Sequence, residues 1–489
     1  MALTRPGRWA AALLCIGLAL RLFHLGHASL WLDEAYETWI AQQPLAQQVA
    51  ISRLFDFHPP LFHFLLDGFM HVWHALGQGE SEAEVRTPSM VFGVLAVWAA
   101  WRGGRDLLGD QAGLFATALL AVSAFAIPFD QEARGYALLN LLTILSAWQF
   151  WRVLTVPARG TIAWYLLATG LAEYIDMRTL LVLAGQGLWL LLCWRRRPAG
   201  WRQGWIAWAV AVAVALPWVP TIVYQLGPQG LGIDLARTFV PPRAIDVILC
   251  PAYLLAGYTG GWSAWVGICI GLAATALVLL GARRGGPAGA YLGVLVGLVV
   301  AGPIAGWYLI HFHGFYFKYC MQVEGLFLLL VGCALSSLPR RALPALAACL
   351  LLGLPSLQHW YFEPQYEKQR WREAMAFVRD RLEPGDAVYI SAPFMAFPAR
   401  YYFGAEPPIH ELVPWKLDSD APAMLAAPRF WLILSNDAAL DPTFKIRKWA
   451  AGLQMSRHLD ATVVDFPNAF DPRTGGAITV ILVPLNSKQ

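Results

Sequence analysis

The sequence predicts an α-helical polytopic membrane protein with about eleven transmembrane helices and a small C-terminal α/β domain outside the bilayer. Composition, the spacing of apolar runs and the placement of arginine carry this prediction. Of the 489 residues, 57% are hydrophobic and 14% are charged, whereas soluble domains carry about 25% charged residues. A water-soluble core cannot bury so much apolar side chain, so lipid must solvate much of the chain.

The apolar runs are spaced as membrane-spanning helices. A helix needs about 20 residues to cross the hydrocarbon, so the spans at the shorter runs must include residues that flank the run. A single segment in lipid can pair all of its backbone N–H and C=O groups internally only as a helix. Each run is therefore expected to be helical. The first run lacks a small-residue cleavage site, so it is predicted to be a retained span rather than a signal peptide. The runs lie at 9–26, 86–101, 112–128, 135–151, 161–175, 179–194, 205–222, 263–281, 288–310, 321–338 and 342–357.

Arginine is concentrated in alternate loops. If the N-terminus lies in the cytoplasm, every inner loop carries at least two arginines, and the outer loops are poorer in them. The positive-inside rule therefore places 27–85, 223–262 and everything after about residue 358 outside. The arginines of the inner loops are Arg5 and Arg8, Arg102 and Arg105, Arg152 and Arg159, Arg195 to Arg197 with Arg202, Arg283 and Arg284, and Arg340 and Arg341.

The tail from 358 to 489 changes character, since it becomes charged and loses its long apolar runs. We therefore divide the chain into a membrane module at 1–357 and a tail domain at 358–489. Apolar residues from Trp371 to Leu382 recur at helical spacing. Three short apolar segments are expected to be buried strands between helices, which predicts an α/β domain with a structural or acceptor-docking role. These segments are 387–391, 430–435 and 477–483.

An acidic pair, Asp33 and Glu34, follows the first span among aromatic and aliphatic residues. One interpretation is structural: Ser29 or Asp33 caps a helix whose dipole Glu34 and Glu37 complement. The other is chemical, because a carboxylate at the membrane surface can take a proton from a hydroxyl group. Carboxylates commonly fill that role in the chemistry of sugars.

His58 stands immediately before Pro59 and Pro60, which suit the first turn of a helix because proline has no N–H to lose there. A histidine at such a helix start can meet an anion together with the helix dipole. A turn histidine without a ligand is the alternative. No cofactor is required by the sequence, and a divalent metal stays open on the weak spacing of the histidines that follow. These are His63, His71 and His74.

Two further outer loops carry a cation beside aromatic residues. Arg134 lies within 131–136, and Lys318 lies within 311–319, which also contains His311 and His313. Arginine at the hydrocarbon edge is costly unless it is paired or reaches the headgroups, but its guanidinium also binds phosphate in a bidentate manner. For Lys318 the alternatives are an interfacial aromatic belt with one long cation and a pocket for an anionic head group.

These motifs resemble the GT-C superfamily, and within it the dolichyl-phosphate-mannose protein mannosyltransferases. They look most like the bacterial members of glycosyltransferase family 39 and the lipid A aminoarabinose transferases. The resemblance covers about the first 150 residues by motif and the rest in topology only. The matching elements are Asp33-Glu34, His58-Pro59-Pro60-Leu61, Arg86-Thr87-Pro88-Ser89 and Glu132 to Tyr136.

The resemblance implies an inverting transfer of one sugar from a polyprenyl-phosphate donor to a lipid, polysaccharide or protein acceptor. The reaction would take place on the periplasmic side of the inner membrane, with the N-terminus cytoplasmic and the tail periplasmic. Asp33 would be the base on the acceptor hydroxyl, with Glu34 shaping its field or helping to bind a metal. Fixed cations around the leaving phosphate would lower the barrier. The candidates are His58, Arg134 and Lys318.

Two departures bear on the donor. The aminoarabinose transferases have lysine where this chain has His58, and histidine binds phosphate only when protonated or through a metal. Many relatives carry arginine where this chain has Lys318, which keeps the charge but loses the guanidinium fork.

Two other functions fit the same features: a transporter or flippase for polyprenyl-linked glycans, and a noncatalytic envelope assembly protein that displays the tail. Transporters usually place polar groups at the membrane midplane and contain repeats, whereas the charges singled out above cluster at one face. Nucleic acid is not an expected partner, because no basic run is long enough to follow a phosphate backbone.

Overall fold

The computed structural model describes residues 5–56, 58–79, 81–226, 242–243, 245–310, 316–404, 408–435, 441, 443–457, 461–467 and 478–485. The chain forms two compact units. The membrane unit comprises Met1–Leu25 and Ile40–Tyr361, and the tail unit comprises Gly26–Trp39 and Phe362–Gln489. The segment that contains the acidic pair therefore belongs to the same unit as the tail. The sequence had predicted domains at 1–357 and 358–489.

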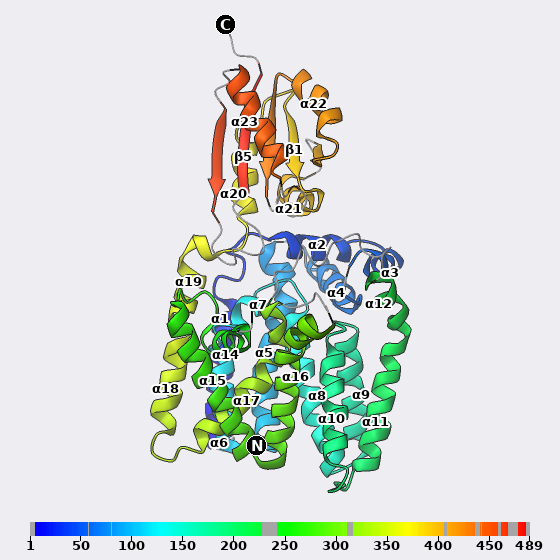
Figure 1. Ribbon diagram of the computed structural model, residues 1–489, viewed down its shortest axis with the longest axis vertical. Helices are drawn as coiled ribbons and strands as arrows, with labels where there is room; N and C mark the ends of the chain where they lie inside the picture. Colours follow the sequence, from blue (N-terminus) through cyan, green and yellow to red (C-terminus); the bar gives the residue numbers. More distant parts are fainter. Residues whose placement is uncertain are drawn as a thin grey trace. The chain divides into compact units, whose positions relative to one another are not determined.

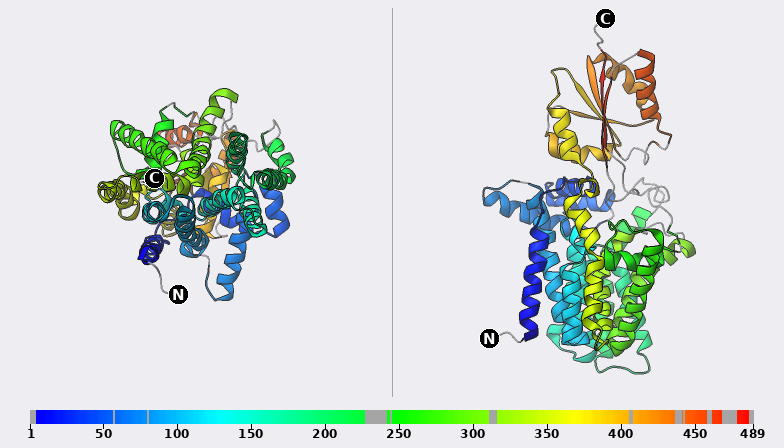
Figure 2. Two further views of the ribbon diagram at one scale, coloured as in Figure 1. Left: turned by 90° about the horizontal axis from the view of Figure 1, so that it is seen from below. Right: turned by 90° about the vertical axis from the view of Figure 1, so that its left-hand side faces the viewer.

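The membrane unit is helical throughout its described residues (Figures 1 and 2). Helix α2 (Leu32–Ala41) runs from the tail unit into it. The helices are α1 (Arg5–Leu22), α3 (Leu45–Leu54), α4 (Leu61–Ala75), α5 (Glu82–Leu108), α6 (Asp110–Ala121), α7 (Ala126–Asp130), α8 (Tyr136–Thr155), α9 (Arg159–Glu173), α10 (Thr179–Leu192), α11 (Trp201–Ala215), η1 (Leu216–Trp218), α12 (Val219–Leu226), α14 (Asp246–Ala256), α15 (Ala264–Arg284), α16 (Gly286–Ile310), η2 (Phe317–Val323), α17 (Glu324–Ser336), α18 (Ala342–Leu352) and α19 (Leu354–Phe362).

Six helical segments within the described residues are long and apolar enough to cross a bilayer. The predicted class, a polytopic helical membrane protein with a small α/β tail, is confirmed, and the count of eleven spans stays a prediction. The six segments are Tyr136–Thr155, Trp201–Gln225, Ala264–Arg284, Gly286–Leu309, Phe317–Ser336 and Ala342–Phe362.

The two ends of the helix bundle differ in the loops that they carry. The turn from α5 to α6 and the turn from α10 to α11 lie at the same end as the N-terminus (Figure 1). The first of these turns pairs Arg105 Nε with Asp110 Oδ1 at 3.0 Å. Helices α4 and α7 lie toward the opposite end. These two arginine-rich turns thus lie at the end of the bundle away from α4 and α7, while the sidedness of the bundle stays a prediction.

Small residues let the central helices approach closely. A Cβ atom added at Gly104 of α5 would lie 2.9 Å from Gly113 Cα of α6, and one added at Gly113 would lie 2.7 Å from the backbone nitrogen of Arg105. Neither position can take a larger side chain without moving a helix. Close backbone approach through glycine is a common way of packing helices in lipid, where the hydrophobic effect does not drive their association.

The tail unit contains a mixed five-stranded sheet with strand order β2-β1-β3-β5-β4. Strand β1 pairs in parallel with β2 and β3, and β5 pairs antiparallel with β3 and β4. The elements are α20 (Trp371–Arg379), β1 (Ala387–Ser391), α21 (Ala396–Phe403), β2 (Ile409–Leu412), α22 (Leu417–Ala426), β3 (Arg429–Leu434), α23 (Lys445–Arg457), β4 (Thr462–Phe466) and β5 (Ile478–Pro484), with short 3-10 turns η3 (Pro364–Tyr366) and η4 (Pro393–Met395).

Alternating strand residues build a core on each face of this sheet. Val388 and Ile390 face one core together with Trp371 and Met375 of α20. The residues between them on the strands face the second core, which α22 and α23 cover, for example with Met424. The predicted helix at Trp371 and the three predicted strands are confirmed, and the sheet contains two more strands, β2 and β4, that the sequence did not reveal.

Candidate functional site

The segment before α4 fixes His58 through Asp56. An Asp56 oxygen accepts a hydrogen bond from the backbone N–H of His58 at 3.1 Å and lies 2.9 Å from His58 Nδ1. The other carboxyl oxygen lies 3.4 Å from His63 Nε2, and Gln225 of α12 donates to the Asp56 carbonyl at 2.5 Å. Burial raises the pKa of Asp56, but His58 and His63 together bring it well below its usual value. Asp56 is therefore a carboxylate with histidine on two sides.

Helix α4 begins where the proline pair predicted. Pro60 is the N-cap residue, and Leu61 is the first helical residue. The Leu61 N–H donates to the Tyr174 carbonyl at 3.1 Å, which ties the start of α4 to the end of α9. His58 stands three residues before the first residue of this helix, whose N-terminus carries partial positive charge that favours anions.

Arg134 lies in the turn between α7 and α8. Ser89 of α5 donates to the Arg134 carbonyl at 2.9 Å. A Cβ at Gly135 would fall 2.8 Å from the Ile175 side chain, so the turn can pack this closely only with glycine there. The guanidinium Nη2 lies 3.3 Å from His58 Nδ1 and 3.4 Å from Nε2. The guanidinium nitrogen is therefore in contact with the imidazole at nearly equal distances from its two ring nitrogens.

Lys318 approaches the same place from the beginning of η2. Its Nζ lies 5.7 Å from the centroid of the Tyr136 ring and 5.0 Å from that of Tyr316. Arg134 Cζ lies 5.9 Å from the same Tyr136 ring. Tyr136, the first residue of α8, therefore has a cation from two different segments beside its ring, a favourable arrangement for the electron-rich face.

His58, Arg134 and Lys318, which we call the cation cluster, are thus brought together from three separate segments of the membrane unit. Two of the segments are helix starts, at α4 and α8, whose dipoles add to the positive potential. Such an arrangement can bind a phosphate and stabilise charge that develops on it.

Arg178, which pairs with Asp176, stands beside this cluster. That ion pair is present, and the Arg178 backbone N–H also donates to Asp176 at 2.8 Å. In addition, the Arg178 guanidinium lies 3.4 Å from the centroid of the Tyr319 ring, next to Lys318 in the chain. This stacking could not be predicted from the sequence, because Arg178 and Tyr319 are far apart in the chain.

The acidic pair lies on α2, in its first turn. Glu34 Oε2 accepts from the Trp31 N–H at 3.4 Å, and the Glu34 carbonyl accepts from the Thr38 hydroxyl at 2.8 Å. Asp33 and Glu34 thus lie in the first turn, where their charges complement the helix dipole as the structural interpretation predicted. Ser29, one of the two predicted caps, donates instead to Glu373 at 3.1 Å.

The tail unit holds the start of α2 through several hydrogen bonds. Tyr402 Oη accepts from the Leu30 N–H at 2.5 Å, and Gln369 Oε1 accepts from the Leu32 N–H at 3.3 Å. Gln369 also accepts from the Trp371 indole at 2.9 Å, and the Leu32 side chain packs against the core that contains Trp371.

Aromatic contacts fix the rest of this helix. Phe397 of α21 lies 4.9 Å from the ring of Tyr36 and 4.9 Å from that of Trp39. Asp33 is therefore carried by the tail unit, and the cation cluster is carried by the membrane unit. The predicted site residues divide between the two units.

The sequence left a divalent metal open. Among the described residues, no group of three His, Cys, Asp or Glu side chains could hold one metal ion. His63 lies against Asp56, and His71 lies 2.9 Å from Asp67, so the two histidines have different carboxylate neighbours. His311 and His313 lie outside the described residues.

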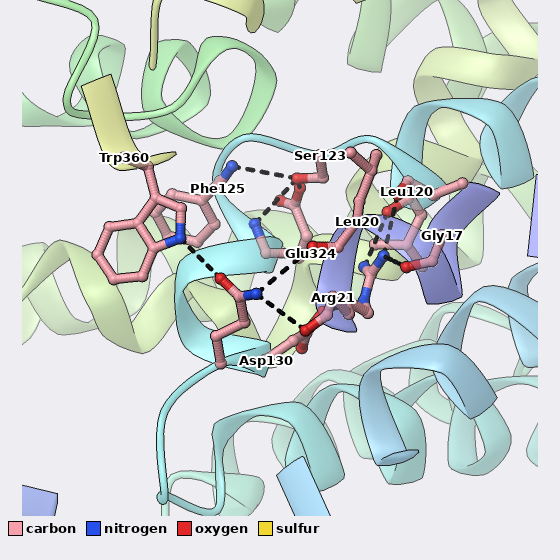
Figure 3. A network of polar contacts seen from close by, with 12 residues as sticks. Gly17, Leu20, Arg21, Leu120, Ser123, Phe125, Asp130, Glu324 and Trp360 are labelled. Atoms are coloured by element: carbon pink, nitrogen blue, oxygen red, sulfur yellow. Dashed lines mark hydrogen bonds and ion pairs between the residues drawn. The ribbon is translucent and has the colours of Figure 1, made fainter. Parts of the chain in front are cut away.

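A buried ion pair that the sequence analysis missed holds α1 against the bundle (Figure 3). Arg21 Nε donates to Asp130 at 2.8 Å, and its other nitrogens donate to the carbonyls of Gly17, Ala121 and Leu120. A side chain at Gly93 would overlap the Asp130 carboxyl group. Arg21 is a single arginine inside the first apolar run, 9–26, and this position was its only distinctive feature in the sequence.

Gln131 extends this network to the last membrane helix. Its amide nitrogen donates to the Arg21 carbonyl at 2.9 Å, and its oxygen accepts from the Trp360 indole at 2.8 Å. The neighbouring Tyr361 hydroxyl donates to the Leu20 carbonyl at 2.6 Å. The end of α1 and the end of α19 are thereby tied to each other and to the loop that continues to Arg134.

Comparison with known proteins supports the predicted resemblance. Residues 57–224 match the family model described as dolichyl-phosphate-mannose-protein mannosyltransferase. This segment contains His58 and Arg134 of the cation cluster. No curated protein matches the chain in sequence.

Solved structures match over almost the whole chain. ArnT from Cupriavidus metallidurans in the apo state aligns with a TM-score of 0.63 at 14% identity, covering 97% of each chain. The same protein bound to undecaprenyl phosphate gives 0.58 at 13% identity, covering 97% of this chain and 98% of that one. The mycobacterial arabinofuranosyltransferase AftD gives 0.51 at 18% identity, covering 100% of this chain and 42% of AftD. The chain therefore has the GT-C fold.

Proposed function

We propose that this protein is an inverting glycosyltransferase that moves one sugar from a polyprenyl-phosphate carrier to a lipid, polysaccharide or protein acceptor. The observation that carries the proposal is the convergence of His58, Arg134 and Lys318 around the start of α8. A phosphate that departs from a sugar gains negative charge as the bond breaks. Cations already in place lower the barrier without reorganising at that moment.

The carboxylate of Asp33 is our candidate for the base. It would take the proton of the acceptor hydroxyl while the acceptor oxygen attacks the anomeric carbon from the side opposite the phosphate. Glu34, which closes the first turn of α2 at Trp31, keeps Asp33 at a helix start. In this proposal Glu34 positions Asp33 and adds its charge to the local field.

The donor class follows from the chemistry of the cluster and from where it lies. Cations at the end of a helix bundle suit a phosphate whose tail remains in lipid. The ArnT structure with undecaprenyl phosphate shows that a protein of this fold holds such a carrier. The arginine-rich turns at the other end of the bundle favour a periplasmic site in the inner membrane, with the N-terminus in the cytoplasm.

Mass analysis of envelope glycolipids and glycans provides the test. Cells without the protein, cells with the wild type and cells with Arg134→Ala would be compared at equal membrane expression. We expect one envelope component to gain a sugar mass with the wild type alone. Arg53→Ala is the matched control, because Arg53 stacks near Trp218 and lies outside the cluster. Identical glycan profiles in cells with and without the protein would refute sugar transfer.

A further inference from the structure

We propose that His58 is a proton-dependent phosphate contact, held by Asp56, which binds the carrier phosphate as an imidazolium and passes its proton to the phosphate oxygen that leaves the sugar. The inference rests on the proposed function and goes beyond it, because it assigns a proton donor and names Asp56 as its positioning residue.

The geometry of Asp56 selects one orientation of the imidazole. The carboxylate accepts from the backbone N–H of His58 and lies 2.9 Å from Nδ1, so the Nδ1 proton faces Asp56. Nε2 is then the nitrogen that gains or loses the second proton. A carboxylate on one nitrogen of a histidine stabilises the charged ring, as in other carboxylate–histidine pairs.

The positive charge of Arg134 disfavours the second proton on His58 when no anion is bound. Its guanidinium nitrogen lies 3.3 and 3.4 Å from the two ring nitrogens of His58. A guanidinium beside a neutral imidazole can donate a hydrogen bond to the unprotonated ring nitrogen, whereas two cations at this distance repel each other. A phosphate that contacts both side chains removes the repulsion. Phosphate binding and protonation of His58 therefore favour each other.

The charged and titratable groups around His58 come from several elements. Asp56 precedes α4, and His63 of α4 faces the other oxygen of that carboxylate. Arg134 faces the ring from the turn before α8, and Lys318 of η2 lies beyond Tyr136. The permanent cations Arg134 and Lys318 and the carboxylate of Asp56 thus surround the imidazole. A histidine ring, unlike these groups, is charged only in the lower part of the physiological pH range.

The transfer step balances as follows. A bond forms between the acceptor oxygen and the anomeric carbon, and the bond from that carbon to the phosphate oxygen breaks. The electron pair of the broken bond stays on the phosphate oxygen, which takes the Nε2 proton of His58. Asp33 holds the proton of the acceptor hydroxyl. Exchange with water then returns the proton to His58 and removes it from Asp33.

Binding of undecaprenyl phosphate by the full-length protein in lipid nanodiscs, measured between pH 6 and pH 8.5, tests the inference. The phosphate itself titrates in this range, so each affinity is divided by that of His58→Lys at the same pH. Lysine keeps its charge up to a pKa of about 10. We expect the ratio of wild-type to His58→Lys affinity to fall about tenfold across this range, because one charge-assisted hydrogen bond is lost.

Two further variants define the role of Asp56. In Asp56→Asn the fall should move to lower pH, since the amide no longer stabilises the imidazolium. Asp67→Asn is the matched control, because Asp67 lies 2.9 Å from His71 in the same helix, outside the cluster, and should leave the ratio unchanged. An affinity ratio that is constant with pH would overturn the inference while leaving the proposed function standing. Folded wild type that binds no undecaprenyl phosphate at any pH would overturn both.

Discussion

At the scale of single residues, the members of the cation cluster supply charge in different ways. Arg134 is always protonated and offers a planar fork, Lys318 is a compact charge, and His58 depends on a proton. The motifs in the sequence were sufficient to single out these three side chains. Asp56 was not singled out, although it stands two residues before His58, because an aspartate before a turn has no distinctive pattern.

The first prediction concerns the guanidinium of Arg134. Arg134→Lys keeps the charge and loses the bidentate fork, so it should weaken binding of undecaprenyl phosphate by about tenfold. Arg134→Ala should weaken it further, by about a hundredfold. Titration calorimetry in detergent would measure both. Equal affinities for Arg134→Lys, Arg134→Ala and the wild type would show that Arg134 does not contact the phosphate.

The second prediction concerns the buried pair of Arg21 and Asp130. Arg21→Met leaves a carboxylate without its cation in the bundle and should destabilise the protein by about 3 kcal/mol or more. The double variant with Asp130→Leu should recover much of this loss, because no unpaired charge remains. Thermal unfolding in detergent, followed by circular dichroism, compares the three proteins. A double variant less stable than Arg21→Met would contradict the assignment.

The sequence could not have identified this pair. Arg21 and Asp130 are 109 residues apart, and the carbonyls that accept from Arg21 include those of Leu120 and Ala121. Arg21 lies inside the run 9–26 and Asp130 just beyond the run 112–128, and neither position points to the other. Only the packing of α1 against α6 and α7 brings them together.

At the scale of elements, the central strands were predictable and the edge strands were not. Strand β1 lies at the predicted residues, 387–391, and is largely buried between two layers of helices. Strand β4 (Thr462–Phe466) is largely exposed, and β2 (Ile409–Leu412) has exposed residues in its middle. Both lie at the edges of the sheet, so they lack the continuous apolar run that marks a buried strand.

The helix α2 illustrates a second limit of the sequence. Its acidic first turn was recognisable, but its attachment to Gln369 and Tyr402 was not, because those residues follow more than 300 positions later in the chain. The tail was expected to be a separate structural or docking domain. In the structure it supports the helix that carries Asp33.

The third prediction concerns pH and the tail unit. Asp386 accepts from Arg429 at 2.6 Å and from the Trp431 indole at 2.9 Å. Burial raises the pKa of Asp386, but these partners lower it below its ordinary value. The ion pair therefore stabilises the tail fully above the unfolded pKa of about 3.9. This stabilisation is lost as the pH falls through the lower folded pKa.

Arg429→Met should accordingly destabilise the tail at neutral pH by about 2 kcal/mol. Hydrogen exchange of the β1 and β3 amides in the full chain would measure the loss, at pH 7 and again at the lowest pH at which the protein stays dispersed. Lys445→Met removes an exposed ion pair with Asp418 and is the control. Unchanged exchange in Arg429→Met at pH 7 would refute this role of the pair.

At the scale of the whole molecule, the chain passes between its units after Leu25, after Trp39 and after Tyr361. Two of these crossing points are tied within the membrane unit. The Tyr361 hydroxyl donates to the Leu20 carbonyl, and the His24 ring donates to the Tyr361 carbonyl at 3.1 Å. The first and last membrane helices thus end together.

The fourth prediction concerns sidedness. An alkaline phosphatase reporter fused after the full chain should be active, because the positive-inside rule predicts a periplasmic tail. A reporter fused in the turn at Arg284 should be inactive. The opposite pattern would put the candidate site in the cytoplasm and contradict the proposed use of a periplasmic carrier.

The most direct test of the account combines binding and transfer in one pair of purified proteins, the wild type and Asp33→Asn. Once the mass shift has identified the acceptor, sugar transfer and undecaprenyl-phosphate binding are measured on the same samples. The account predicts that both proteins bind undecaprenyl phosphate equally and that the variant transfers sugar about a thousandfold more slowly. Removal of the base slows the chemical step and leaves the affinity for the carrier unchanged. Transfer by Asp33→Asn at the wild-type rate would contradict it.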